Sequence, residues 1–228
     1  MKREDCATFS VFVLQICFEF LISNFGFSGT LYHMKKLLLT CSLLLLAGCV
    51  DKEGLSEEST KPPTGNANSS IVVEEYADLQ CPACKGAHSQ IVEPLLEKYG
   101  NVIRYEFKHF PLAQIHAFAH EAAEAAECAA DQGKFWEFVN DTYENQDQIS
   151  REDLITRAEK LGTSDMDLYR RCVQSRIKRN TVQADYKAGY ALGVRGTPTF
   201  FVSGERVPRN TLEGISEIIE KKVGSQRL

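Results

Sequence analysis

The feature that most constrains this chain is a pair of cysteines, Cys81 and Cys84, placed where a predicted strand meets a predicted helix. Residues 71–76 are rich in β-branched and aromatic side chains, which favour a strand. After Cys84, apolar residues recur at helical spacing as far as Tyr99, and Pro82 suits a first helical turn because it has no N–H to leave unpaired. Cys81 is therefore expected at a helix N-terminus, where free amide groups favour a thiolate that solvent can reach.

This arrangement predicts redox chemistry of the two sulfurs. Cys84 lies one helical turn beyond Cys81, so their Cα atoms are expected roughly 5–6 Å apart, within disulfide range. Disulfide exchange then passes through a mixed disulfide on Cys81, which Cys84 resolves. Zinc needs about four ligands, and no second CxxC follows, while Lys85 stands where attached haem requires histidine. An inert structural disulfide is the remaining alternative, and we expect no metal and no organic cofactor.

The order of the predicted elements indicates an α/β fold. A second strand is expected at 102–107, an almost wholly helical block at 112–193, a third strand at 196–202 and a C-terminal helix from Leu212 to about Val223. The helical block is too long for a loop, so we expect an inserted all-helical subdomain. The outer elements predict a small mixed sheet flanked by helices.

Local signals indicate where helices begin and bend. Pro94 lies inside the first helix and predicts a kink or a break there. The longest helical stretch is expected at 113–145. Capping patterns predict further helix starts at Ser150-x-x-Asp153, Ser164-x-x-Asp167 and Asn210-x-x-Glu213.

The composition fits a folded domain and argues against two classes of protein. Of 228 residues, 43% are hydrophobic and 25% charged, an ordinary globular balance that argues against wholesale disorder. The 26 Lys and Arg against 31 Asp and Glu give a net charge of −5, whereas a nucleic-acid-binding protein needs a basic face. No nucleic-acid partner is expected.

Residues 1–49 are expected to direct export rather than to fold. Met34 opens a short basic region, the apolar run 37–46 follows, and Leu46-Ala47-Gly48-Cys49 resembles a bacterial lipobox. The resemblance implies diacylglycerol on the Cys49 sulfur and cleavage before it; an ordinary signal peptide with a chance cysteine is the alternative. Because Met34 begins a complete signal, residues 1–33 are expected to be untranslated, with a membrane span at 9–22 as the alternative.

The segment 50–70 lacks periodicity and is rich in Ser, Glu, Pro, Gly and Asn. Such a composition predicts a flexible linker that tethers the folded domain, 71–228, to the membrane. A disordered tail without a role is the alternative.

Four ordered segments extend the cysteine motif: EYADLQCPACK at 75–85, FKHFPL at 107–112, AECAADQGKFW at 126–136 and GVRGTPTF at 193–200. Together they resemble the DsbA-type thiol-disulfide oxidoreductases, over 71–228. The resemblance implies a thioredoxin-like sheet with a helical insertion at about 112–193, in agreement with the order of elements.

The resemblance also implies roles for individual residues. Thr197-Pro198 matches the cis-proline loop that faces the two cysteines, where the Thr197 backbone would pair with a bound peptide; an ordinary trans proline is the alternative. Glu75 matches a buried acid that tunes Cys84 and carries its proton, although a lone strand Glu more often faces solvent. His109, His116 and His120 read as surface polar residues and receive no role.

Two further cysteines, Cys128 and Cys172, lie on inward faces of the helical block. In an oxidising compartment they are expected to pair, closing a loop of about 44 residues. Two separate core cysteines packing as small apolar groups are the alternative.

These features predict a monomeric enzyme on the extracytoplasmic side of the cell envelope, anchored to lipid through Cys49. As the resemblance implies, its Cys81–Cys84 disulfide passes to reduced or unfolded secreted polypeptides, and a quinone-linked membrane partner reoxidises it. Pro82 and Ala83 place no charge or imidazole between the cysteines, so the redox direction stays open. The alternatives are an envelope reductase or isomerase and a non-catalytic peptide-binding lipoprotein.

Overall fold

A five-stranded mixed sheet carries the cysteine motif in a computed structural model that describes residues 52–225. The strand order is β1-β3-β2-β4-β5, with β2 and β3 parallel and the other pairs antiparallel. The bounds are Thr64–Gly65 (β1), Val72–Ala77 (β2), Arg104–His109 (β3), Thr199–Val202 (β4) and Glu205–Arg206 (β5). The described residues from Leu55 onward form one compact unit, and the mixed thioredoxin-like sheet predicted from the sequence is confirmed.

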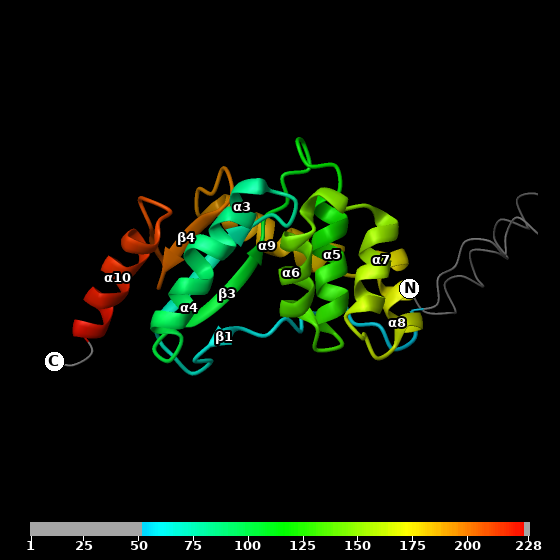
Figure 1. The fold of residues 1–228 in the computed structure, drawn as a ribbon, viewed down its shortest axis with the longest axis horizontal. Helices are drawn as coiled ribbons and strands as arrows, with labels where there is room; N and C mark the ends of the chain where they lie inside the picture. Colours follow the sequence, from blue (N-terminus) through cyan, green and yellow to red (C-terminus); the bar gives the residue numbers. More distant parts are fainter. Residues whose placement is uncertain (1–51, 226–228) are drawn as a thin grey trace, which may run out of the picture. The chain divides into compact units, whose positions relative to one another are not determined.

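The helices cover the sheet and build the insertion (Figure 1). They are α3 (Pro82–Ala87), α4 (Glu93–Tyr99), α5 (Ala119–Ala130), α6 (Phe135–Glu144), α7 (Arg151–Lys160), α8 (Met166–Ser175), α9 (Arg179–Ala191) and α10 (Leu212–Ser225). A 3-10 helix spans Gln146–Gln148. Helices α4 and α10 share an apolar cluster with the sheet, and α5 to α8 enclose a second one that reaches the cysteine motif.

The first predicted helix is broken next to Pro94, as expected. Residues His88–Val92 form a π-helical turn in which the N–H of Glu93 bonds to the carbonyl of His88, five residues earlier. Pro94 has no N–H to continue the α-helical pattern, which accounts for the wider turn. Gly133, with a φ of +69°, separates α5 from α6, so the long helix expected at 113–145 is two helices.

Two of the three predicted caps are displaced by one residue. Ser150 caps α7 through a bond from the Asp153 N–H, as predicted. Asp165 rather than Ser164 caps α8, and the Thr211 hydroxyl accepts from Gly214 at 3.1 Å where Asn210 was expected. In each case a neighbouring side chain supplies an equivalent oxygen, which the spacing alone does not distinguish.

Most of the predicted tether is packed against the folded unit, so the flexible linker over 50–70 is a wrong prediction for its described part. Leu55 packs on the core and β1 pairs with β3. The Nζ atom of Lys178, buried in the insertion, donates to the carbonyl of Glu58 at 2.5 Å. Lys61 lies 2.8 Å from a carboxylate oxygen of Glu127. We call residues 55–63 the strap; its polar side chains are ordered because they satisfy buried charges.

The expected signal, the lipobox and Cys49 lie outside the described residues. Between residues 52 and 225, none of the helices has the length and apolar character needed to cross a membrane.

Candidate functional site

Cys81 begins α3 directly after the turn that follows β2. As the N-cap residue it has an extended backbone, and its carbonyl accepts the N–H groups of Cys84 and Lys85, each at 3.1 Å. Pro82 occupies the first helical position, as predicted. Cys81 and Cys84 are free thiols in this structure, so it presents the reduced state of the pair.

Cys81 is less open to solvent than the sequence predicts. Cys81 is 7% exposed to solvent, whereas Cys84 is 0% exposed. The difference from expectation has a clear cause, because the sulfur lies 3.6 Å from the carbonyl oxygen of Thr197, on a loop that covers it. The sulfur is therefore shielded from the side of Thr197, although it remains the more accessible of the two.

The surroundings of Cys81 favour its thiolate. A hydrogen bond from the Cys84 thiol contributes most to lowering the pKa of Cys81 to about 5. Thr197 and the amides of Ala83 and Cys84 lower it further, against the opposing effect of burial. The amides act as predicted for a helix N-terminus. A lowered pKa thus arises without any charge between the cysteines.

Cys84 has the opposite character. Burial raises its pKa well above the usual value, and the charges of Glu75 and Cys81 raise it further. Its sulfur lies 3.5 Å from the backbone N–H of Asp78, which points at it. The pair therefore divides into an ionisable outer sulfur and a protonated inner one.

The loop opposite the cysteines contains a cis peptide bond between Thr197 and Pro198, as the resemblance implied. The side chain of Asn210 donates to the carbonyl of Pro198 at 2.7 Å, and the Thr199 hydroxyl donates to the carbonyl of Gly196 at 2.8 Å. These bonds fix the loop from both sides, which holds Thr197 beside the Cys81 sulfur.

Glu75 is buried rather than exposed, so the solvent-facing alternative is wrong. Its side chain is 1% exposed and accepts a hydrogen bond from the Tyr105 hydroxyl. Burial raises the pKa of Glu75 to about 7, although the bond from Tyr105 lowers it, and the charge of Cys81 adds to the rise. The structure places this acid beneath the cysteine motif.

Asp78 links the motif to the loop after β3, a role that the sequence reasoning missed. Its carboxylate accepts the N–H of Gln80, the N–H of Leu112 and a ring nitrogen of His116, each at 2.8 Å. The loop stands at the top of Figure 1. The role of Asp78 has one signal in the sequence. An Asp that lies two residues before a backbone N–H donor in a turn is typical of an Asx turn.

The histidines depart from their expected surface placement. His109 is buried, and a ring nitrogen lies 3.2 Å from a carboxylate oxygen of Glu127. His116 and His120 have the i, i+4 spacing of a metal-binding pair, but His116 is bonded to Asp78. Over the described residues, no three or more His, Cys, Asp or Glu side chains are arranged to hold a metal ion.

Cys128 and Cys172 form a disulfide, with Cα atoms 5.9 Å apart and a separation of 44 residues. It joins α5 to α8 inside the insertion. The pairing expected from the sequence is therefore present, and it is separate from the cysteine motif.

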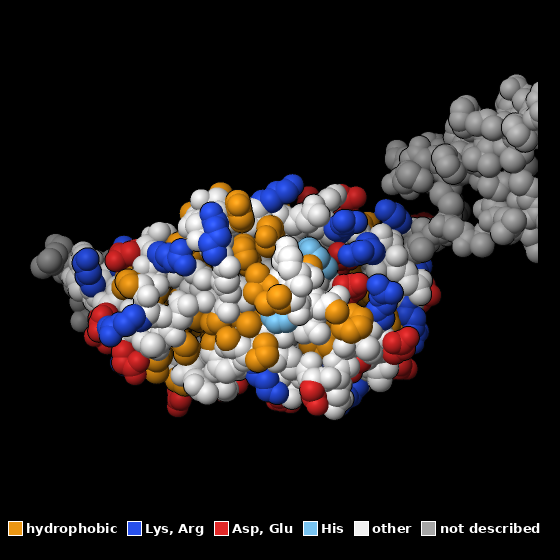
Figure 2. All heavy atoms as spheres, turned by 90° about the horizontal axis from the view of Figure 1, so that it is seen from above, with side chains coloured by type: hydrophobic (Ala, Val, Ile, Leu, Met, Phe, Trp, Pro, Cys, Tyr) orange, Lys and Arg blue, Asp and Glu red, His pale blue; other side chains and the backbone are white. Residues whose placement is uncertain are grey.

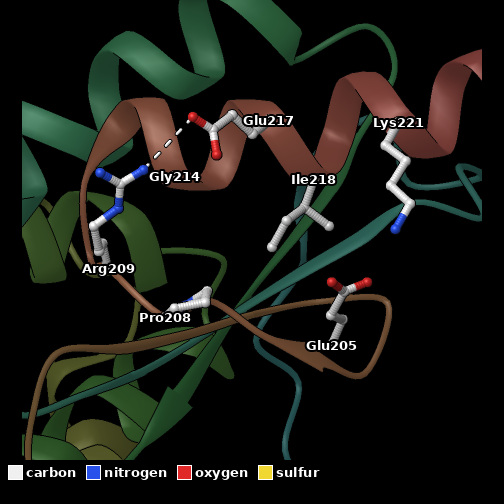
Figure 3. Close-up of a pocket in the computed structure, with 7 residues that line it drawn as sticks. All are labelled: Glu205, Pro208, Arg209, Gly214, Glu217, Ile218 and Lys221. Carbon is white, nitrogen blue, oxygen red and sulfur yellow. Dashed lines mark ion pairs between the residues drawn. The ribbon is translucent and has the colours of Figure 1, made fainter.

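A further pocket lies between β5 and the start of α10 (Figure 3). It is lined by Glu205, Pro208, Arg209, Gly214, Glu217, Ile218 and Lys221. Arg209 and Glu217 form an ion pair at 3.6 Å within it. Because neither cysteine nor the cis-proline loop lines it, the pocket takes no part in the sulfur chemistry.

The face of the domain seen from above in Figure 1 carries apolar, basic and acidic side chains (Figure 2). Apolar atoms gather toward its middle, while Lys and Arg side chains lie mostly toward its edges.

Comparison with known proteins agrees with this geometry. A thioredoxin family model matches residues 57–221. A Na(+)/H(+) antiporter NhaA 3 from Salinispora tropica is 39% identical over 166 residues, covering 72% of this chain and 25% of that protein, and an NhaA 1 from Salinispora arenicola is 36% identical with the same coverage. The chain thus spans about a quarter of the length of the curated relatives it matches.

Solved structures share the fold. BdbD from Bacillus subtilis superposes with a TM-score of 0.64 at 20% identity, covering 72% of this chain and 94% of that one. Wolbachia pipientis alpha-DsbA1 gives 0.58 at 23% identity, covering 72% and 90%. Both structures share the thioredoxin-like fold of this chain. The chain belongs to the thioredoxin family.

Proposed function

We propose that the protein is an extracytoplasmic thiol-disulfide oxidoreductase that donates the Cys81–Cys84 disulfide to reduced secreted polypeptides. The observation that carries the proposal is the division of the pair, with the pKa of Cys81 lowered to about 5 and that of Cys84 raised. A thiolate stabilised in the reduced protein makes the oxidised protein a stronger oxidant. This supports oxidation over reduction as the direction.

The reaction follows from the positions of the sulfurs. A substrate thiolate attacks the Cys81 sulfur of the enzyme disulfide, the bond between the two enzyme sulfurs breaks, and Cys84 leaves as a thiolate that takes up a proton. A second substrate thiolate attacks the substrate sulfur of the mixed disulfide. Cys81 then leaves as a thiolate, its favoured state, and the substrate has gained a disulfide while the enzyme holds two more electrons.

The cis-proline loop supports the binding of an extended polypeptide. Thr197 lies beside the Cys81 sulfur, two residues before the first residue of β4. A substrate segment adding to the sheet there would present its cysteine to Cys81.

The proposed location and partners follow from the sequence features outside the described residues. Lipid attachment at Cys49 would hold the enzyme at a membrane, where a quinone-linked membrane protein would reoxidise it. The matching region of relatives named as Na(+)/H(+) antiporters supports a place near a membrane. A Cys49→Ser variant is expected to leave the membrane fraction.

Substitution of each cysteine tests the function. Refolding of a reduced disulfide protein by the oxidised enzyme should be lost in Cys81→Ser. Reduced Cys84→Ser, mixed with a polypeptide that carries a disulfide, should be trapped as a mixed disulfide, because Cys81 attacks that disulfide and no Cys84 thiol resolves the product. A peptide-binding lipoprotein without catalysis would keep its ligand in both variants and accelerate no refolding. A redox titration separates the directions, because a potential near about −120 mV indicates an oxidase and one near about −270 mV a reductase.

A further inference from the structure

A group of buried polar side chains lies behind the inner cysteine. Glu75 on β2, Tyr105 on β3 and Tyr143 on α6 are 1%, 0% and 3% exposed. Burial raises the pKa of each tyrosine well above its usual value, and the charges of Glu75 and Cys84 raise it further. These residues therefore share one low-dielectric region with the Cys84 sulfur.

The strand register explains how Tyr105 reaches Glu75. Val73 pairs with Tyr105 and Glu75 with Phe107 across the parallel strands. Side chains two residues apart on a strand share a face, so Tyr105 and Glu75 are diagonal neighbours within reach of each other. The Tyr105 hydroxyl donates to Oε2 of Glu75.

The second oxygen of Glu75 is unpaired. Oε1 of Glu75 is one of six buried side-chain polar atoms of the described residues that have no hydrogen-bond partner, and the hydroxyl of Tyr143 is another. Nearly all buried polar atoms in proteins are paired, and the charge of Glu75 acts on Cys84, so Oε1 is a free acceptor on the acid that influences the inner cysteine.

We propose that Tyr105 is a positioning residue that holds Oε2 of Glu75 and so leaves Oε1 free for the proton of Cys84, the exchange that the resemblance implies for Glu75. The inference rests on the proposed function. In the oxidation of substrate, Cys84 leaves Cys81 as a thiolate and takes the proton of the Glu75 carboxyl group, which becomes a carboxylate. Reoxidation reverses the transfer, so that the proton returns to Glu75 as the Cys84 sulfur bonds to Cys81.

The charged and titratable groups around Glu75 determine in which direction its pKa should move in a variant. Cys81 and Cys84 face it from α3, Tyr105 from β3 and Tyr143 from α6, and the charge of Asp78 also acts on Tyr143. Of these, the Tyr105 hydroxyl lowers the pKa of Glu75 by stabilising the carboxylate. Removing that hydroxyl must therefore raise the pH at which Glu75 ionises.

The variant Tyr105→Phe tests this, with Tyr169→Phe as a matched control. Tyr169 is also fully buried, and its hydroxyl donates to the carbonyl of Leu154 at 3.1 Å, within the insertion. Carboxyl ¹³C NMR of the reduced protein follows Glu75, assigned with Glu75→Gln. We expect the Glu75 midpoint to rise by about one pH unit in Tyr105→Phe, since a hydrogen bond to a charged group is lost. It should not move in Tyr169→Phe.

A second readout addresses the sulfur chemistry. The pH profile of enzyme reduction by dithiothreitol, which involves no polypeptide binding, should shift upward with the Glu75 midpoint in Tyr105→Phe alone. An unchanged midpoint in Tyr105→Phe, or an equal shift in the control, overturns the inference. If Tyr105→Phe does not fold, the NMR signal of the Tyr105 ring carbon is followed in the wild type across the same pH range. The inference requires this signal to shift with the midpoint of Glu75, and a signal that does not change with pH overturns the inference.

The two proposals fail separately. A wild-type protein that exchanges no disulfides contradicts the proposed function, while the NMR titration still reports whether Tyr105 controls Glu75. An active wild type with no coupling between Tyr105 and Glu75 contradicts this inference alone.

Discussion

Cys81 occupies an N-cap position without the side-chain oxygen that usually fills it. Its thiolate is instead stabilised most by the Cys84 thiol, and also by Thr197 and by backbone amides, which lowers its pKa to about 5. The helix start and the cis-proline loop thus act on one atom from opposite sides. A cysteine at the same place in the sequence, but without the Thr197 loop, would lose part of this stabilisation.

Asp78 should be needed for the geometry of the motif. In Asp78→Ala the N–H groups of Gln80 and Leu112 lose their buried acceptor, and each unsatisfied group costs about 1–3 kcal/mol. We expect the free energy of unfolding to fall by at least about 2 kcal/mol in a urea titration. The exposed Asp147→Ala serves as control, with an expected change within about 0.5 kcal/mol. Equal effects of the two variants would contradict this role.

The site residues predicted from the sequence are those within short motifs. Cys81, Cys84 and Pro198 stand in local patterns whose chemistry is independent of distant contacts. Asp78 and Tyr105 depend on partners 38 and 30 residues away. Such pairings follow from the strand register and the course of a loop, which a single sequence does not encode locally.

At the scale of elements, the disulfide between α5 and α8 should stabilise the insertion without serving the reaction. A closed loop of 44 residues restricts the unfolded chain by about 4 kcal/mol. We expect Cys128→Ala/Cys172→Ala to lose about 3–4 kcal/mol in urea unfolding while dithiothreitol still reduces the Cys81–Cys84 bond at the wild-type rate. A loss below about 1 kcal/mol, or a slower reaction, would show that the bond acts otherwise.

The strap should be a structural part of the domain. Lys61 lies 2.8 Å from Glu127 and 2.6 Å from Asp185, and Glu127 is wholly buried. Lys61→Met leaves that carboxylate without its lysine, which costs about 3 kcal/mol for a buried pair.

Urea unfolding checks this, with the exposed Lys187→Met on α9 as control. Lys187→Met should change the free energy of unfolding by less than about 0.5 kcal/mol. If Lys61→Met also changed the free energy of unfolding by less than about 0.5 kcal/mol, the strap would not stabilise the domain, and a flexible linker over this segment would be the better description.

Elements were predicted better than their ends. The strand predicted at 102–107 lies at Arg104–His109, and the helix caps at Ser164 and Asn210 moved by one residue. Alternation and capping residues indicate that an element exists, but tertiary contacts select its bounds. The strap was missed because its partners, Glu127 and Lys178, lie 66 and 120 residues further along the chain.

At the scale of the whole molecule, the lowered pKa of Cys81 links redox state to stability. Its folded pKa of about 5 lies below the unfolded value of about 8.5. A group with a depressed folded pKa adds stability that is complete above the unfolded value and is lost as the pH falls through the folded value. The oxidised protein has no Cys81 thiol to titrate, so this contribution belongs to the reduced protein.

We therefore expect the reduced protein to gain stability over the oxidised one as the pH rises from about 5 to about 8.5. Urea unfolding of both forms at several pH values measures the difference. Reduced Cys81→Ser should lack the rise. A difference that stays constant with pH would mean that the thiolate is not stabilised by the fold.

The overall architecture was predicted because several independent signals agree. The CxxC motif at a strand end, the long helical block and the Gly-Thr-Pro-Thr segment each fit one fold. The packing of the insertion and the strap around the sheet could not be predicted from the sequence. Buried charged residues such as Glu127 and Lys178 cannot be told from surface residues in a sequence.

The most direct test is the pH dependence of Cys81 alkylation by iodoacetamide in the reduced protein, with the modified cysteine identified by mass spectrometry. Shielding by Thr197 slows the reaction at every pH but does not move its midpoint. The account predicts a midpoint of about 5 for Cys81, with Cys84 unmodified throughout the range. A midpoint near about 8.5, the value of an ordinary thiol, would contradict it.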